Sequence, residues 1–134
     1  MRSLIEASRL RVASAVNSAM VLTYWSIGAR IATEVIADER GEYGKRVVER
    51  LADLLSAEYG SGFSKRNLFE MVRIARLFPD SRIVQTLSAQ LGWSHFVVLS
   101  RLDEPLQREF YAQMGATERW SVRTLQQKIQ GMLF

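Results

Sequence analysis

Hydrophobic and polar positions recur along nearly the whole chain with the spacing of amphipathic helices. In residues 4–36, apolar side chains return every three or four positions, as expected for one helical face. The same spacing predicts further helices over 43–59, 64–78, 81–91, 94–102, 105–115 and 121–134. The pattern shows no internal repeat and no clear linker. The sequence therefore predicts an all-α fold, a compact multi-helix domain that spans residues 1–134 as one unit.

Glycine, serine and proline mark where the predicted helices begin and end. Ser64 and Ser121 are placed to cap helices, and Pro105 suits a first helical turn. The Gly60-Ser61-Gly62 run predicts the end of one helix, and Gly115 predicts the end of another. Residues 38–42 are predicted to form a charged turn. Gly28 lies inside the first helix, where it predicts a close crossing by a second helix.

Residues 84–102 have the pattern of a helix-turn-helix-like unit, in which two short helices meet at a sharp turn. Apolar side chains are placed where the two helices would contact each other, and the small Ser88 lies where they would cross. Gly92 lies at the turn, where it is expected to take a positive φ. Ser94 is expected to cap the second helix, the element that such units insert into a DNA major groove. The apolar contact positions are Leu87, Leu91, Trp93 and Val98. Arg101 departs from the pattern, and a tight helical corner in a bundle is the alternative.

Composition narrows the class of protein. The 134 residues include no cysteine and a single histidine, which excludes disulfides and argues against thiolate or histidine-built metal sites. No apolar run is long enough for a membrane helix, and the N-terminus lacks the apolar segment of a signal peptide. We therefore expect a cytoplasmic protein with no membrane association.

The net charge of +4 lies entirely in the C-terminal part of the chain. Residues 1–60 hold eight basic and eight acidic side chains, whereas residues 61–134 hold ten basic and six acidic ones. The excess therefore falls in the half with the helix-turn-helix pattern. This asymmetry favours a nucleic-acid partner.

The predicted helix 64–78 presents a basic face. Lys65, Arg66, Arg73 and Arg76 fall within an arc of about 100°, and Phe69 lies in the middle of that arc. Basic side chains around an aromatic ring suit a phosphate backbone. A solvated face, with Phe69 covered by another helix or subunit, is the alternative. Arg123, in the last helix near Trp120, is a further candidate phosphate contact.

The sequence carries no motif for catalysis or for a cofactor. His95 has no evident carboxylate or nucleophile partner, so a structural or DNA-contacting role is favoured over a catalytic one. A PD-(D/E)xK nuclease needs an acidic residue two positions before a lysine, and Tyr43, Phe63 and Gln126 occupy those positions. We therefore expect no catalytic residue, metal, cofactor or small-molecule substrate in this chain.

Five short segments occur in an order that resembles one bacterial family. They are Tyr24-Trp25-Ser26-Ile27-Gly28, Tyr43-Gly44, Gly62-Phe63-Ser64 with Asn67-Leu68 and Met71, Trp93-Ser94-His95, and Trp120-Ser121 with Leu125. Their order is similar to that in the N-terminal domain of the YhcG-like bacterial proteins, long described as a domain of unknown function. The similarity extends from about Val16 to Phe134.

The resemblance implies a targeting role. In that family the helical domain precedes a PD-(D/E)xK nuclease domain and is regarded as a DNA-binding, helix-turn-helix-like module. It implies that residues 1–134 are the N-terminal part of a longer nuclease-linked protein. The apolar chain end at Leu133-Phe134 agrees with such a continuation, and docking of these two side chains into the core is the other explanation.

Two functional hypotheses follow. The first is a non-catalytic DNA-binding module of a nuclease-linked protein. In it, the basic helix contacts phosphates and the second helix of the corner reads a groove, through Lys65, Arg66, Phe69, Arg73, Arg76, Ser94, His95, Arg101 and Arg123. The second hypothesis is an interaction module that forms a homodimer or docks onto a partner protein. In this case the long first helix supplies the self-complementary face.

Overall fold

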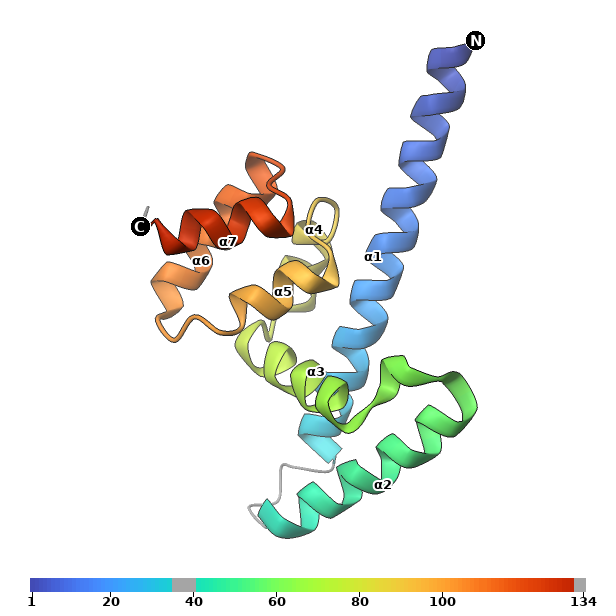
Figure 1. Ribbon diagram of the computed structural model, residues 1–134, viewed down its shortest axis with the longest axis vertical. Helices are drawn as coiled ribbons and strands as arrows, with labels where there is room; N and C mark the ends of the chain where they lie inside the picture. The colour runs from blue at the N-terminus through green and yellow to red at the C-terminus, as the bar shows by residue number, and fades with distance from the viewer. Residues whose placement is uncertain (35–40, 132–134) are drawn as a thin grey trace. The chain divides into compact units, whose positions relative to one another are not determined.

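The computed structural model describes residues 1–34 and 41–131, and it confirms the all-α prediction (Figure 1). In this part of the chain there are seven α-helices, one 3₁₀ turn and no strand. The helices are α1 (Arg2–Glu34), α2 (Gly41–Tyr59), α3 (Lys65–Leu77), α4 (Ser81–Leu87), α5 (Trp93–Leu99), α6 (Pro105–Thr117) and α7 (Val122–Gln130), and the 3₁₀ turn η1 spans Ser61–Phe63.

The helices gather into two compact units. The middle unit comprises Thr23–Pro79, and the terminal unit comprises Met1–Leu22 together with Asp80–Phe134. Helix α1 contributes its first part to the terminal unit and its second part to the middle unit. That residues 1–134 act as a single domain stays a prediction.

A close helix crossing organises the middle unit. A Cβ atom on Gly28 would lie 2.0 Å from the backbone oxygen of Met71, so only glycine lets α1 and α3 approach this closely. The indole Nε1 of Trp25 donates a hydrogen bond to the carbonyl oxygen of Phe78, at 2.7 Å. This bond fixes the end of α3 on α1. The crossing predicted at Gly28 is therefore confirmed.

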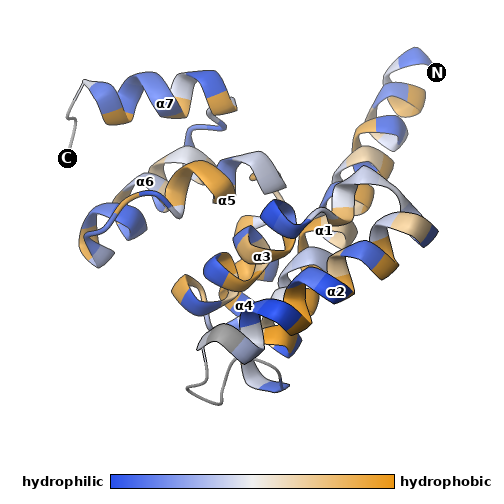
Figure 2. Cartoon of the chain, turned by 60° about the horizontal axis from the view of Figure 1, so that its bottom comes forward, coloured by the Kyte–Doolittle hydropathy of each residue, from blue (hydrophilic) through white to orange (hydrophobic). Residues whose placement is uncertain are grey.

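Local sequence signals set the ends of α2 and α3. Helix α2 ends at Tyr59 because Gly60 takes a positive φ of 98°, which an L side chain rarely adopts. Ser64 caps α3 as predicted, since its hydroxyl accepts a hydrogen bond from the backbone N–H of Asn67. Apolar and polar positions alternate around both helices (Figure 2), and one face of each is buried. The buried apolar side chains of this unit are Ile31, Val48, Ala52, Leu68, Met71, Val72, Ile74, Ala75 and Phe78.

The terminal unit forms its core around α5, which packs against both α6 and α7. Ser121 caps α7 and Pro105 occupies the first turn of α6, both as the sequence indicated. Asp80 caps α4. The buried apolar side chains are Val21, Val84, Leu87, Leu91, Phe96, Leu99, Tyr111, Ala112 and Leu125.

Helix α6 ends later than predicted, and its buried face includes a charged residue. It continues past the buried Gly115 to Thr117, and Leu106 is 70% exposed. Arg108 is buried instead, beside Tyr111. Arg108 can be buried because its aliphatic stem packs in the core while its guanidinium bonds to nearby carbonyl oxygens.

The corner between α4 and α5 also differs from the prediction in two details. Gly92 has φ −89° and ψ 176°, which is extended backbone and not the expected positive φ. Gly92 itself is the N-cap residue of α5, so Ser94 lies within the first turn and does not cap the helix. The core contacts expected at Leu87 and Leu91 are present, while Trp93 and Val98 are only half-buried.

Some predictions fall on residues whose structure is not described. The end of the first helix at Ile36 and most of the turn at 38–42 lie outside the described residues, as do Leu133 and Phe134. Within the described residues, none of the helices combines the length and the apolar character that crossing a membrane requires.

Candidate nucleic-acid interface

Polar side chains of α1 hold the connection between α4 and α5. The Asn17 side-chain amide donates to the carbonyl oxygens of Ser88 and Leu91, at 3.0 and 3.1 Å. Ser18 and Ser14 donate to the carbonyl oxygens of Ser88 and Ala89. These carbonyls lie beyond the end of α4, where a helix leaves its acceptors without partners. Sequence reasoning missed this role, although polar residues within an uncharged helical stretch were a signal.

His95 ties the start of α5 to the start of α7. Its Nδ1 accepts a hydrogen bond from the backbone N–H of Gly92, at 3.0 Å, so the ring proton lies on Nε2. This Nε2 donates to the carbonyl oxygen of Trp120, at 2.7 Å. Both ring nitrogens are therefore engaged within the terminal unit. This geometry favours the structural role named for His95 over contact with a base.

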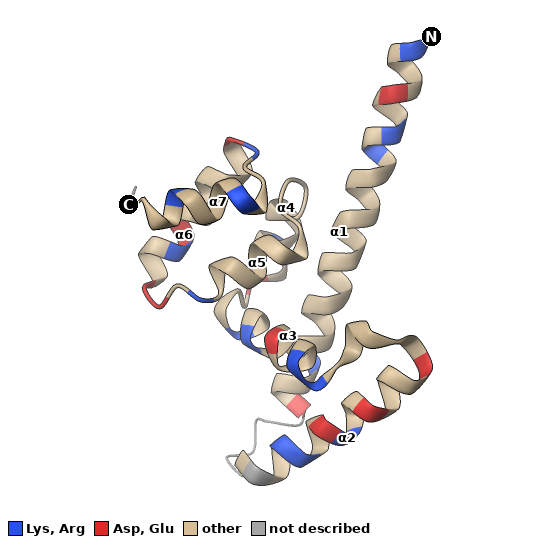
Figure 3. Cartoon of the chain, in the orientation of Figure 1, with Lys and Arg blue, Asp and Glu red and all other residues tan. Residues whose placement is uncertain are grey.

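Arg101 and Arg123, two of the sequence-predicted contacts, line the same groove. The groove lies between the end of α5 and α7 and has a volume of about 590 Å³. None of the described residues that line the groove is acidic. The charged residues of α7 are all basic (Figure 3). Most of α7 is hydrophilic (Figure 2). The remaining lining residues are Val98, Leu102, Gln126, Gln127, Ile129 and Gln130.

The composition of the groove suits recognition of a polar, anionic surface. Guanidinium groups pair with phosphates or with the edge of guanine, and glutamine amides pair with adenine. The apolar side chains give the groove a floor, while Arg101 and Arg123 are both exposed. The glutamines were not named from the sequence, because only folding brings α7 beside the end of α5.

Arg108 fixes the backbone next to Arg101. Its guanidinium Nη2 donates to the carbonyl oxygen of Leu102 at 2.8 Å and to that of Asp103 at 3.5 Å. Its Nε is buried and has no hydrogen-bond partner among the described residues. The buried arginine thus holds the segment that follows α5, and with it one side of the groove.

Internal ion pairs occupy part of the predicted basic face of α3. The Lys65 ammonium lies 2.8 Å from a carboxylate oxygen of Glu49 in α2, and Arg66 lies 3.8 Å from Glu70. The hydrogen bond from Lys65 is the main reason that the pKa of Glu49 lies below its usual value; desolvation partly opposes it, and the charges of Lys65 and Lys45 add to it. A phosphate would therefore compete with Glu49 for Lys65.

The other predicted contacts of α3 are exposed to different degrees. Arg73 and Arg76 are exposed, and Phe69 is half-buried between the basic positions. All five predicted residues of α3 belong to the middle unit, whereas Ser94, His95, Arg101 and Arg123 belong to the terminal unit. The structure therefore brings the predicted residues together as two separate sets.

Ser94 completes the predicted residues of the terminal unit, and two further basic residues, Lys128 and Arg119, lie in or next to α7. Ser94 is exposed in the first turn of α5, at the opposite end of this helix from Arg101. The Lys128 ammonium lies 5.7 Å from the centroid of the Trp120 ring, within the range of a cation–π contact. Arg119 has a positive φ of 55° in the connection between α6 and α7. Lys128 thus adds a second positive charge to α7, beside that of Arg123.

The described residues contain no group of three or more histidine, cysteine, aspartate or glutamate side chains that could hold a metal ion. The groove itself offers guanidinium, amide and apolar groups, and no lining side chain able to act as a general base.

Comparison with known proteins supports the resemblance drawn from the motifs. The family model described as the DUF1016 N-terminal domain matches residues 1–134. The Escherichia coli (strain K12) protein named "Putative nuclease YhcG" is 31% identical over 156 aligned positions, which cover 94% of this chain. The chain spans only 42% of that relative's length. No solved structure matches the chain.

Proposed function

Because the chain belongs to the DUF1016 N-terminal domain family, a nuclease-associated family, we propose that it is a non-catalytic DNA-binding module. In this proposal the module delivers a nuclease-linked protein to its DNA, and catalysis resides in a separate domain. The Escherichia coli relative carries the word nuclease in its name and is more than twice as long as the match, which leaves room for such a domain.

The observation that carries the proposal is the groove between α5 and α7. Two exposed arginines and three glutamines meet there, with no acidic side chain among the described lining residues. Arginine and glutamine are the side chains that serve phosphates and base edges. A groove for a small apolar ligand would instead be enclosed and lined mainly by apolar groups.

The α4–α5 corner acts in this proposal as a helix-turn-helix-like unit. Helix α5 follows a five-residue connection whose carbonyl oxygens are bonded by α1, so its position is fixed within the terminal unit. Ser94 and Arg101 are exposed at its two ends. The helix would present these residues to a DNA groove, while Arg123 contacts the adjacent phosphate backbone.

The basic face of α3 contributes a second, weaker contact in the proposal. Lys65 and Arg66 both form ion pairs with glutamates. Each of these ion pairs must break before the basic side chain can bind a phosphate, which weakens the contact. Arg76 is exposed and makes no ion pair with a described residue, so it is the member of this set best placed to add affinity. Binding through α3 is expected to depend strongly on salt.

The groove is tested by removing its arginines one at a time. Arg101→Gln and Arg123→Gln should each weaken binding of duplex DNA, by about tenfold for a contact worth 1.4 kcal/mol. Fluorescence anisotropy of a labelled duplex at low salt measures the loss. Circular dichroism confirms that each variant keeps its helical content.

Arg82→Gln is the matched control, because Arg82 is an exposed arginine of the same unit that does not line the groove. It removes the same charge and should leave the affinity nearly unchanged. Equal losses in all three variants would mean that net charge alone attracts DNA, and the assignment of the groove would fail.

A protein-interaction function is favoured by a different observation. The first part of α1 exposes a row of large apolar side chains, including Leu4, Ile5 and Val12. Water-exposed apolar rows of this kind mark protein–protein contacts. The two functions are compatible, since helix-turn-helix proteins commonly bind DNA as dimers.

A further inference from the structure

The first thirteen residues of the chain, which include the beginning of α1, make no side-chain hydrogen bond to any other described element. All of them but Ala7 are exposed, and the hydrogen bond between Arg11 and Ser8 stays within the helix. The first side-chain bond to another element is made by Ser14. A helix of this length without tertiary contacts is marginal in water. Its exposed apolar side chains therefore indicate a surface that another molecule covers.

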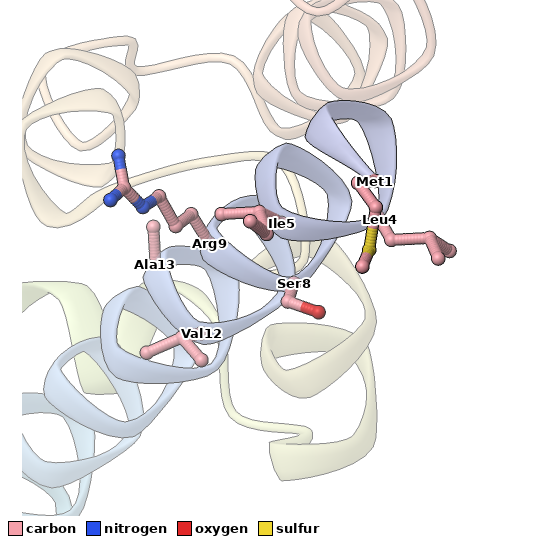
Figure 4. Close-up of a pocket in the computed structure, with 7 residues that line it drawn as sticks. All are labelled: Met1, Leu4, Ile5, Ser8, Arg9, Val12 and Ala13. Atoms are coloured by element: carbon pink, nitrogen blue, oxygen red, sulfur yellow. The ribbon is translucent and has the colours of Figure 1, made fainter.

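Four exposed apolar residues and one exposed serine form a seam, defined here as Met1, Ile5, Ser8, Val12 and Ala15. Four other large exposed apolar residues of α1 lie outside this seam: Leu4, Leu10, Val16 and Met20. The seam residues follow one another at intervals of four, three, four and three residues, which is the spacing of the a and d positions of a coiled coil. Figure 4 shows side chains of this stretch, Ile5 and Val12 among them, on successive turns of the single helix α1. Ile5 is 54% exposed and Val12 63% exposed.

The seam lies on the face of α1 that points away from its own unit. At 100° per residue, it is centred about 150° from the residues that contact the rest of the unit. Those contacts are made by Ser14, Asn17, Ser18 and the buried Val21. The helix thus bonds to its own unit through a largely polar face and leaves an apolar face uncovered.

We propose that this seam pairs with the same seam of a second copy of the chain, as a parallel two-stranded coiled coil. The complement of a seam with this spacing is a helix with the same spacing. The two a positions hold β-branched residues, Ile5 and Val12, as in parallel two-stranded coiled coils. The d positions hold Met1, Ser8 and Ala15 in place of the leucine that is usual there. The pair would have the two-fold symmetry that is commonest among homodimers.

The flanking charges select the parallel arrangement. In parallel register, Arg9 of one copy faces Leu4 of the other, and Arg11 faces Val16, so no like charges meet across the seam. An antiparallel pairing centred on the seam, with Val12 against Ser8, would instead place Arg9 against Arg9 and Arg11 against Arg11. Like charges at these flanking positions are unfavourable.

Sedimentation equilibrium of the whole chain, without DNA, tests this pairing independently of the proposed function. The wild-type chain should form a dimer at high protein concentration, and Val12→Lys should raise the dissociation constant of the dimer by about tenfold or more. Leu10→Lys is the matched control, because Leu10 is a 72% exposed apolar residue on a different face of the same helix. It should leave the dimer intact.

Cross-linking tests the direction of the two helices. The chain has no cysteine, so a single Val12→Cys variant carries one thiol per copy. Parallel pairing brings the two thiols within disulfide reach, and mild oxidation should yield a covalent dimer, while Leu10→Cys should not. A wild-type chain that stays monomeric at every concentration would overturn the proposal. So would a dimer that Val12→Lys leaves intact, or a covalent link that forms only between Val12→Cys and Ser8→Cys chains.

Discussion

His95 illustrates how much one side chain fixes in this protein. Its imidazole accepts from Gly92 and donates to Trp120, two backbone groups that are far apart in the sequence. Trp120 directly precedes the cap of α7, so the ring sets where α5 and α7 begin relative to each other. The groove with Arg101 and Arg123 lies between these same two helices. His95 is therefore assigned a positioning role.

Substitutions of His95 should lower the free energy of unfolding by an amount that depends on how many of its two hydrogen bonds the new side chain retains. His95→Ala leaves a partly buried N–H and a partly buried carbonyl without partners, and we expect a loss of about 1–3 kcal/mol in the free energy of unfolding. His95→Asn retains an acceptor near Gly92, and His95→Gln retains a donor near Trp120, so each should lose less. Urea unfolding measures the series. A His95→Ala variant as stable as the wild type would contradict the positioning role.

Two glycines inside helices should respond in opposite ways to alanine. Gly28→Ala places a methyl group on the backbone of Met71, which cannot give way, and we expect a loss of about 3 kcal/mol or more. Gly115→Ala meets only ordinary contacts of 3.5 Å or longer, so the better helix propensity of alanine should stabilise α6 by up to about 1 kcal/mol. Thermal unfolding distinguishes the two. Equal effects would contradict the close crossing of α1 and α3.

At the scale of helices, an ion pair joins α2 to α3 and makes their contact dependent on pH. The pKa of Glu49 is lowered in the folded chain, chiefly by its hydrogen bond with Lys65. A lowered folded pKa contributes stability above the unfolded pKa, and this contribution is lost as pH falls through the folded pKa. Both side chains are largely exposed, so the effect is small and screened by salt.

The expected outcome is a difference between wild type and Glu49→Gln that depends on pH. The wild type should unfold at a higher temperature at neutral pH, and the two melting temperatures should converge in acid, below about pH 4. Thermal unfolding across a pH series measures this convergence. A difference that stays constant over the whole range would exclude the pair as its cause.

Helix positions could be predicted from the sequence wherever the signal was local. The caps at Ser64, Asp80 and Ser121 and the break at Gly60 depend on residues within one turn of the helix end. The start of α5 was misassigned because its N-cap N–H is satisfied by His95, a residue already inside the helix. Spacing alone does not show which side chain provides a cap.

Packing partners could not be predicted to the same degree. Arg108 was not expected in the core, because a charged residue is buried only when distant carbonyl oxygens receive its hydrogen bonds. The meeting of Arg101 with Arg123, and of both with the glutamines of α7, depends on tertiary packing of α5 against α7. The individual arginines were named from the sequence, but the groove was not.

For the whole molecule, the two proposals give the two surfaces different roles. The groove between α5 and α7 would contact DNA, the seam of α1 would pair two copies, and the nuclease chemistry would belong to another domain. A parallel dimer would present two such grooves. Residues 1–134 would then act as the part that selects where a larger protein acts.

The most direct test of DNA recognition is the salt dependence of binding to duplex DNA, measured by fluorescence anisotropy. For the wild type, the logarithm of the affinity should fall linearly with the logarithm of the salt concentration. The Arg101→Gln/Arg123→Gln variant should bind more weakly and give a slope shallower by about 1, because Arg123 is the member of the pair assigned to a phosphate. A folded wild-type chain that does not bind duplex DNA at low salt would contradict the DNA-binding account.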